Sequence, residues 1–240
     1  MSQPSRYAVY LAPPPASELW RFGCDVLGRD AGAGEPSRPF AFDGIDAEAW
    51  RELTAEPRRY GFHATLKAPF RLAVGKSADE LIRAVAALAD TLAPFDAGPL
   101  RVSTIALGRN RAFVALTPIA PSADLARLEH TVVRSLDAFR APLSATERER
   151  RNPERLTPRQ REMLDAWGYP YALDEFRPHF TLTNAVEGAE PVAGTLAREF
   201  ERRVDSPLLR VDALALYAES GTERVFTILR RFPLGGRAAA

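Results

Sequence analysis

Two short stretches of the chain place a histidine in the same frame, YGFHATL at residues 60–66 and RPHFTLT at residues 177–183. In both, the histidine is followed by any residue, then a threonine and a leucine. The chain has only three histidines. Because chance would place a Ser or Thr two positions after a given histidine roughly one time in ten, two matches among three indicate a repeat.

The segments that follow the two motifs also recur in the same order. Each motif reads as a strand, and a segment with helical spacing and two more strand-like segments follow it. His63 and His179 lie 116 positions apart, while LRVSTIALG at residue 100 and LRVDALALY at residue 209 lie 109 apart. Such a duplication predicts two lobes that face each other. An α+β protein can also repeat this unit without sharing a site between the copies.

Length and composition allow a substantial hydrophobic core. The chain has 240 residues, of which 46% are hydrophobic and 26% charged, which suits one large domain or two small lobes in close contact. We expect a single bilobal domain over 1–240, with lobe one at roughly 1–120 and lobe two at roughly 121–240. The alternation of strand and helix patterns predicts the α+β class.

Charge, cysteine count and hydropathy exclude several classes of protein. The net charge is +1, so no overall field attracts a nucleic acid or a membrane surface. One cysteine, Cys24, permits no internal disulfide and no cysteine-based zinc site. The chain starts without a leader pattern, and no apolar run reaches the roughly 18 residues of a membrane span. We therefore expect a cytoplasmic protein without a membrane segment, acting as a monomer.

Strand parity places the polar residues of each motif on one face. Residues i and i+2 of a strand point to the same side, so His63, Thr65 and Lys67 form one row. His179, Thr181 and Thr183 form the other. The alternating apolar residues would face the core, which leaves an imidazole beside a hydroxyl on the opposite side, where a cleft could lie.

Two histidines can serve both sides of one phosphorus. At neutral pH one imidazole can accept a proton while another, next to a phosphate, donates one. The hydroxyls of Thr65 and Thr181 could donate hydrogen bonds to the non-bridging oxygens as charge builds there. Neither motif has an Asp, Glu, Cys or further His within ligand spacing, so we expect no metal and no cofactor.

FHATL and HFTLT, in a duplicated frame of strands and helices, resemble the paired motifs of the 2H phosphoesterase superfamily, which includes RNA 2′,3′-cyclic phosphodiesterases. RYGFHATLKAPF, the chain length and the charged middle further resemble an uncharacterised bacterial branch whose genes often accompany phosphonate-degradation operons. The resemblance implies two pseudo-symmetric antiparallel sheets around a central cleft, with helices outside. It also implies that His63 and His179 are catalytic and that Thr65 and Thr181 bind phosphate.

Residues 141–176 depart from the compact members of that superfamily. This Arg-rich segment has helical patterning and stands where a short connection would suffice. It could steer anions as a lid over the cleft. Because glutamates alternate with the arginines, the alternative is a solvated helical face held by salt bridges. An extended RNA groove is not expected in either case.

Three further residues are weaker candidates. Lys67 and Arg177 share the parity of the motif residues, so both are predicted to bind phosphate, although a basic residue near a strand end is often simply solvated. His130 lies between apolar helix positions and is expected at a helix edge, outside the chemistry.

The sequence therefore predicts a metal-independent phosphoesterase that opens a cyclic phosphodiester on a small phosphorylated sugar or nucleotide. A ribosyl 1,2-cyclic phosphate, used in phosphonate metabolism, is the example that the resemblance favours. Two alternatives remain: an RNA 2′,3′-cyclic phosphodiesterase, and a non-catalytic module that binds a phosphorylated ligand. The basic stripe and stacking aromatic residues typical of RNA binding are not evident in the sequence.

Overall fold

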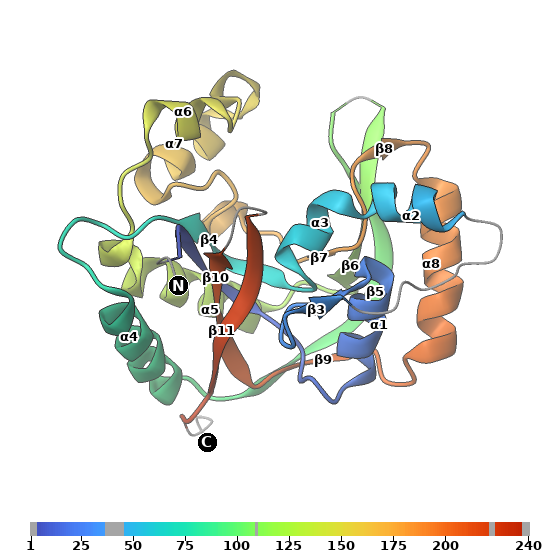
Figure 1. The fold of residues 1–240 in the computed structure, drawn as a ribbon, viewed down its shortest axis with the longest axis horizontal. Helices are drawn as coiled ribbons and strands as arrows, with labels where there is room; N and C mark the ends of the chain where they lie inside the picture. Colours follow the sequence, from blue (N-terminus) through green and yellow to red (C-terminus); the bar gives the residue numbers. More distant parts are fainter. Residues whose placement is uncertain (1–3, 37–45, 109, 221–223, 237–240) are drawn as a thin grey trace.

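The computed structural model describes residues 4–36, 46–108, 110–220 and 224–236 of the chain. Its architecture is a curled antiparallel sheet with helices packed around it (Figure 1). The α+β class predicted from the sequence is therefore confirmed. No helix among these residues is long and apolar enough to cross a membrane.

Strands and helices alternate along most of the chain. The strands are β1 (Arg6–Leu11), β2 (Arg29–Asp30), β3 (Glu35–Pro36), β4 (Ala64–Phe70), β5 (Phe95–Ala106), β6 (Arg111–Pro118), β7 (Phe180–Thr181), β8 (Val186–Glu187), β9 (Leu208–Val211), β10 (Ala213–Ser220) and β11 (Val225–Pro233). The α-helices are α1 (Glu18–Leu27), α2 (Ala47–Leu53), α3 (Ala55–Tyr60), α4 (Ala78–Thr91), α5 (Ala123–Ser135), α6 (Ala145–Glu149), α7 (Pro158–Trp167) and α8 (Glu190–Arg203). The 3₁₀ turns in the described ranges are η1 (Asp137–Phe139), η2 (Pro153–Arg155) and η3 (Leu173–Glu175).

The main sheet runs in the order β11-β10-β1-β4-β7-β6-β5-β9, with β8 paired to β6. β4 comes from the first half of the chain, and its side of the sheet is completed by β10 and β11 from the C-terminal end. β7 comes from the second half of the chain, and its side of the sheet is completed by β5 and β6 from the first half. The two copies of the repeat therefore exchange strands. Resemblance to the superfamily implied two sheets; here the two halves join into one.

The halves join where β4 and β7 pair. In this antiparallel junction Ala64 lies opposite Phe180, and β7 continues into the second half by pairing with β6. Both apolar side chains are buried, at 1% exposure each. Because the residue before each of them is a histidine, the junction brings the two motifs together in space.

Helices cover the two halves separately. Contacts link α4 to β10 and β11, and α8 to β5, and α4 and α8 lie at opposite sides of the molecule in Figure 1. Helix α4 begins with a complete capping box between Ser77 and Glu80, as its sequence predicts. Its apolar face buries Leu81, Val85 and Ala89 in the core, so amphipathic spacing and capping together explain this helix.

Helix α1 lies against the start of β4 through a glycine. A Cβ at Gly23 would fall about 2.0 Å from the ring of Phe62, so no larger residue fits here without moving that ring. Phe62 is fully buried and stacks on Phe180 with 4.9 Å between ring centroids. The residues next to both histidines are thus packed on each other and on α1.

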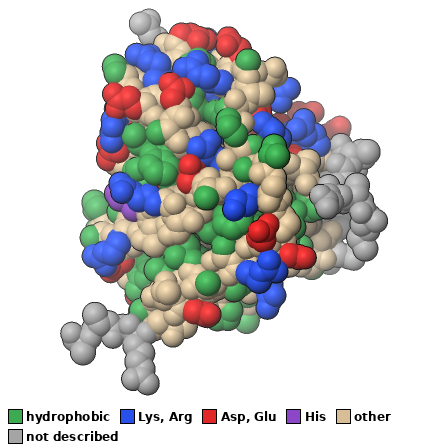
Figure 2. Space-filling model, turned by 90° about the vertical axis from the view of Figure 1, so that its left-hand side faces the viewer, with side chains coloured by type: hydrophobic (Ala, Val, Ile, Leu, Met, Phe, Trp, Pro, Cys, Tyr) green, Lys and Arg blue, Asp and Glu red, His purple; other side chains and the backbone are tan. Residues whose placement is uncertain are grey.

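The insert at 141–176 forms α6, η2, α7 and η3, and it projects at the top of Figure 1. Its helical character agrees with the sequence pattern. Four side chains, Val133, Met163, Ala172 and Leu173, make a small apolar cluster that fixes the insert on α5. Basic and acidic side chains alternate over the upper part of the face in Figure 2, and ion pairs such as Arg148–Asp165 hold its surface together.

Candidate active site

The register of the β4–β7 junction arranges the four motif residues as a square. Because Ala64 lies opposite Phe180 in an antiparallel pair, one step outward on either side places His63 opposite Thr181 and Thr65 opposite His179. Directly opposed residues of antiparallel strands have Cβ atoms about 4.5–5.5 Å apart on one face of the sheet. Each histidine is therefore next to the threonine of the other motif.

Both imidazoles are oriented by the same backbone contact. Nδ1 of His63 lies 2.8 Å from the carbonyl oxygen of Gly61, and Nδ1 of His179 lies 2.7 Å from that of Arg177. A carbonyl oxygen can only accept, so Nδ1 carries the proton in each ring. In the neutral form, Nε2 of each histidine is then left with its lone pair for a ligand or a proton.

Gly61 supplies the carbonyl for His63 because of its backbone conformation. Its φ is 75°, in the region that favours glycine, and a Cβ at this position would lie 2.5 Å from that of Ala31. A side chain is excluded on both grounds. The glycine in YGFHATL is therefore a positioning element that the sequence pattern alone did not identify.

The threonines of the two motifs lie beside the β4–β7 junction. Thr65 Oγ1 lies 3.5 Å from Nε2 of His63, at the long limit of a hydrogen bond. The Thr181 hydroxyl forms no hydrogen bond within the described residues, and both threonines are half-buried. These two hydroxyls can donate to an oxyanion placed between the histidines.

Aromatic rings line the site on the side of His63. Tyr10 stacks on the imidazole with 3.8 Å between ring centroids and 23° between planes. Tyr217 and Tyr60 lie at 6.0 and 6.1 Å from it. On the other side, the ring of Phe113 is 5.5 Å from that of His179. These rings restrict imidazole rotation and reduce access of water.

Burial favours the neutral form of both histidines. It lowers the pKa of His63 to about 4; the Gly61 carbonyl opposes the shift, and the charge of His179 adds to it. Burial also lowers the pKa of His179, against the effect of the Arg177 carbonyl. Because each charge would disfavour the other, the two imidazoles are electrostatically coupled, and an anion between them would raise both pKa values.

The other predicted phosphate ligands are placed differently. Lys67 is 3% exposed; its Nζ lies 3.0 Å from Oδ1 of Asp137 and donates to the Val133 carbonyl at 3.2 Å. The pairing of β1 with β4 shifts register between Thr65 and Lys67, so simple strand parity does not hold there. The Arg177 side chain is exposed, and its carbonyl orients His179.

Two residues from the sequence analysis serve the fold. Thr183 accepts a hydrogen bond from the Val114 amide at 2.9 Å and donates to the Asn184 carbonyl at 2.9 Å. Cys24 is buried on α1.

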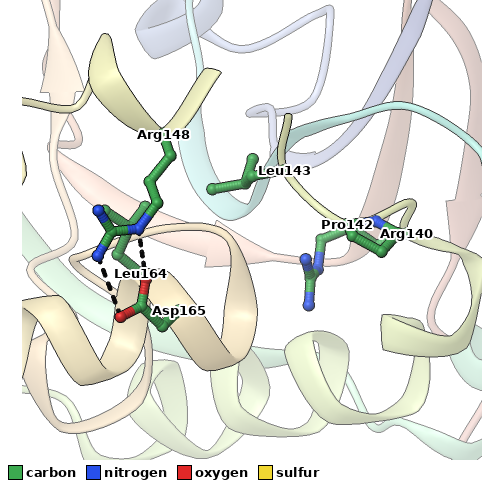
Figure 3. Close-up of a pocket in the computed structure, with 6 residues that line it drawn as sticks. All are labelled: Arg140, Pro142, Leu143, Arg148, Leu164 and Asp165. Atoms are coloured by element: carbon green, nitrogen blue, oxygen red, sulfur yellow. Dashed lines mark hydrogen bonds and ion pairs between the residues drawn. The ribbon is translucent and has the colours of Figure 1, made fainter. Parts of the chain in front are cut away.

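A cavity of about 310 Å³ lies within the insert, between α6, α7 and the segment that leads into them (Figure 3). It is lined by Arg140, Pro142, Leu143, Arg148, Leu164 and Asp165. Both arginines have acidic partners, since Arg148 pairs with Asp165 and Arg140 with Asp137. This cavity has none of the motif residues and belongs to the packing of the insert. Within the described ranges, no three His, Cys, Asp or Glu side chains gather as a metal site would require.

Comparison with protein families gives a match over residues 65–227 to a family described as "Protein of unknown function (DUF1045)". Two curated relatives, from Laribacter hongkongensis and Janthinobacterium sp., are both named ribose 1,5-bisphosphate phosphokinase PhnN. They are 36% and 32% identical over 94% and 97% of this chain. The match covers 51% of each relative, so the chain spans about half the length of the curated relatives it matches.

Among solved structures, Escherichia coli LigT is similar in its apo form, with 17% identity and a TM-score of 0.45 over 97% of this chain and 98% of that one. LigT complexed with 3′-AMP gives 18% and 0.45 over 97% and 99%. TT0787 of Thermus thermophilus gives 15% and 0.43 over 97% and 100%.

Proposed function

The chain belongs to the DUF1045 family, and we propose that this member is a metal-independent phosphoesterase that opens a cyclic phosphodiester with two histidines. The observation that carries the proposal is the pairing of Ala64 with Phe180 in the β4–β7 junction, which brings the two preceding histidines close enough for the charge of His179 to lower the pKa of His63. A matched pair of oriented imidazoles suits proton transfer, whereas simple phosphate binding would be better served by arginine, lysine or a helix N-terminus.

In the proposed reaction, a water molecule attacks phosphorus from one side while the bond to the leaving oxygen breaks on the other. Nε2 of one histidine accepts the proton of the water, and Nε2 of the other, protonated, donates its proton to the leaving oxygen. Thr65 and Thr181 donate hydrogen bonds to the non-bridging oxygens. The cyclic diester becomes a monoester and a free hydroxyl.

Proton supply follows from the electrostatics of the site. Burial lowers the pKa of both imidazoles and so favours their neutral form in the free protein. The negative charge of a bound phosphodiester favours an imidazolium beside it, so substrate binding would supply the acid while the second imidazole stays neutral as the base. The same arrangement works for either assignment of the two roles.

The substrate we propose is a small ribosyl 1,2-cyclic phosphate, consumed in the cytoplasm within phosphonate metabolism. Support comes from the names of the curated relatives, ribose 1,5-bisphosphate phosphokinases. If water breaks the bond between phosphorus and the C2 oxygen, the phosphate stays on C1. When C5 also carries a phosphate, the product is ribose 1,5-bisphosphate, the compound in that name.

A substrate panel tests this proposal. Purified protein is incubated with 5-phosphoribosyl 1,2-cyclic phosphate, nucleoside 2′,3′-cyclic phosphates and RNA that ends in a cyclic phosphate, and kcat/KM is measured for each. We expect the sugar cyclic phosphate to give the highest value. Efficient opening of RNA ends with an inert sugar phosphate would favour the RNA phosphodiesterase. Binding without turnover of any substrate would favour the non-catalytic module.

A further inference from the structure

Arginines of the insert differ in whether they have acidic partners. Arg148 pairs with Asp165 at 2.9 Å, and Arg159 pairs with Asp174 at 2.6 Å. Arg151 has no carboxylate partner within the described residues, and its side chain is only half-buried. Its charge is therefore available to a ligand.

Arg151 is held by an aromatic ring instead of an acid. Its guanidinium carbon lies 5.4 Å from the ring centroid of Tyr169, and Tyr169 in turn meets Tyr171 edge-on at 5.6 Å. At this distance the guanidinium is in cation–π contact with the ring, which uses none of its N–H groups as hydrogen-bond donors to an acid. The coplanar N–H donors of a guanidinium group match the oxygens of a phosphate monoester.

Tyr169 connects Arg151 to the histidine site. The phenols of Tyr169, Tyr60 and Tyr10 interact electrostatically, so the three lie near one another. Tyr10 stacks on His63, and the ring of Tyr60 is 6.1 Å from that of His63. Arg151 therefore contacts a ring that belongs to the group of tyrosines beside His63, here called the tyrosine wall: Tyr10, Tyr60 and Tyr169.

The segment that follows Tyr169 is anchored to α5 by a buried hydrogen bond. Glu129 of α5 is 1% exposed and accepts a hydrogen bond from the Leu173 amide at 3.1 Å. By contrast Arg6, which also lies close to Tyr10 and Tyr60, is already paired with Glu219 through two hydrogen bonds. Of these two arginines, only Arg151 has no carboxylate partner among the described residues, so it can bind an anion.

We propose that Arg151, in cation–π contact with Tyr169, binds a second phosphate group of the substrate, the monoester that stays intact while the two histidines open the cyclic ester. This inference rests on the proposed function and adds its substrate class: a small sugar cyclic phosphate that carries a further phosphate on another carbon. Tyr60 and Tyr169, which are half-buried, would contact the sugar, and their hydroxyls can donate to it.

Binding without turnover tests this subsite independently of the reaction. The probe is ribose 5-phosphate, with ribose as the reference, measured by titration calorimetry on wild type, Arg151→Gln, Arg151→Lys and Arg150→Gln. Arg150 is the matched control because it is adjacent, exposed and without an ion pair in the described chain. Loss of a charge-assisted contact should weaken ribose 5-phosphate binding roughly 10-fold to 100-fold in Arg151→Gln. Arg151→Lys should lose less, and Arg150→Gln should match wild type.

Kinetics with paired substrates separate this subsite from the proposed function. Arg151→Gln should lower kcat/KM for 5-phosphoribosyl 1,2-cyclic phosphate through KM, with little change for ribosyl 1,2-cyclic phosphate. If both substrates are opened and the variant does not discriminate between them, the subsite is refuted and the function stands. If neither is opened but ribose 5-phosphate binding depends on Arg151, the function fails and the subsite stands. Wild type that does not distinguish ribose 5-phosphate from ribose overturns the subsite.

Discussion

His63 and His179 hold their rings in the same way, each through a hydrogen bond from Nδ1 to the carbonyl of the residue two positions earlier. The repeat visible in the sequence is therefore also a repeat of ring orientation. Because both rings have the same tautomer, both have Nε2 available for proton transfer. Which ring acts as acid would then depend on the side from which the substrate enters.

The first prediction concerns the titration of the two histidines. Burial lowers the pKa of His63 to about 4 and also lowers that of His179. In NMR titrations of the imidazole resonances, both should therefore have midpoints below the ordinary 6.5, with assignments from His63→Gln, His179→Gln and His130→Gln. Addition of inorganic phosphate should raise the midpoints. A midpoint at or above the ordinary value for both free imidazoles would contradict this description of the site.

The same shifts predict how stability depends on pH. An unfolded histidine takes up a proton as pH falls through about 6.5, while the folded His63 resists protonation until about 4. The unfolded state thus binds more protons in this window, and the free energy of unfolding should decrease as pH falls from about 6.5 towards about 4. His63→Gln should reduce this decrease, which urea unfolding at several pH values would measure.

Another prediction concerns Lys67, whose ammonium group is buried next to the carboxylate of Asp137. Asp137→Asn should destabilise the protein by about 2 to 4 kcal/mol, because a buried cation loses its carboxylate; Asp137 is partly exposed, which reduces the effect. Lys67→Met should cost less than about 1 kcal/mol, since Asp137 keeps its pairing with Arg140. Urea unfolding measures both.

Turnover of Lys67→Met then tests the phosphate-binding role predicted from strand parity. With the ammonium committed to Asp137 and the Val133 carbonyl, we expect kcat/KM to stay within about threefold of wild type. A selective loss of about tenfold or more in a folded variant would show that Lys67 leaves Asp137 to contact substrate.

A further prediction compares two helical glycines, one crowded by a neighbouring ring and one with open space around it. Gly23→Ala drives a methyl group into the Phe62 ring and should destabilise the protein by about 1 to 3 kcal/mol. Gly194 of α8 has open space, with only an Arg198 nitrogen at 3.7 Å, so Gly194→Ala should stabilise by roughly 0.5 to 1 kcal/mol. Thermal unfolding compares them, and equal effects would exclude the proposed packing of α1 on Phe62.

Much of the fold could be predicted because local signals agree with tertiary packing. Helix α4 has both apolar spacing and a capping box, and it forms where the pattern predicts. The second motif was expected to form a strand, but β7 covers only Phe180–Thr181, since Thr183 bonds to the Val114 amide through its side chain. Helices α2 and α3 were not predicted, because their short segments lack a clear periodicity.

The sequence predicted the histidines and threonines of the candidate site, but not the residues that surround them. A repeated His-x-Thr frame identifies four side chains, and a single register pair is enough to bring them together. The exchange of strands between the two halves depends on long-range pairing that no local pattern encodes. Tyr10 was missed for the same reason, because its contact with His63 joins two strands that are distant in sequence.

The central claim is that two histidines, each one residue before the paired strands β4 and β7, open a cyclic phosphodiester without a metal. Its most direct test is ³¹P NMR of 5-phosphoribosyl 1,2-cyclic phosphate incubated with wild type, His63→Ala, His179→Ala and the double variant, each with and without EDTA. We predict conversion of the cyclic signal to a monoester by wild type, unchanged by EDTA. Each single variant should lose roughly 100-fold to 10,000-fold in rate, and the double variant little more, because the residues act as a unit. Opening by the double variant at the wild-type rate, or loss of wild-type turnover in EDTA with recovery on adding a divalent cation, would contradict the account.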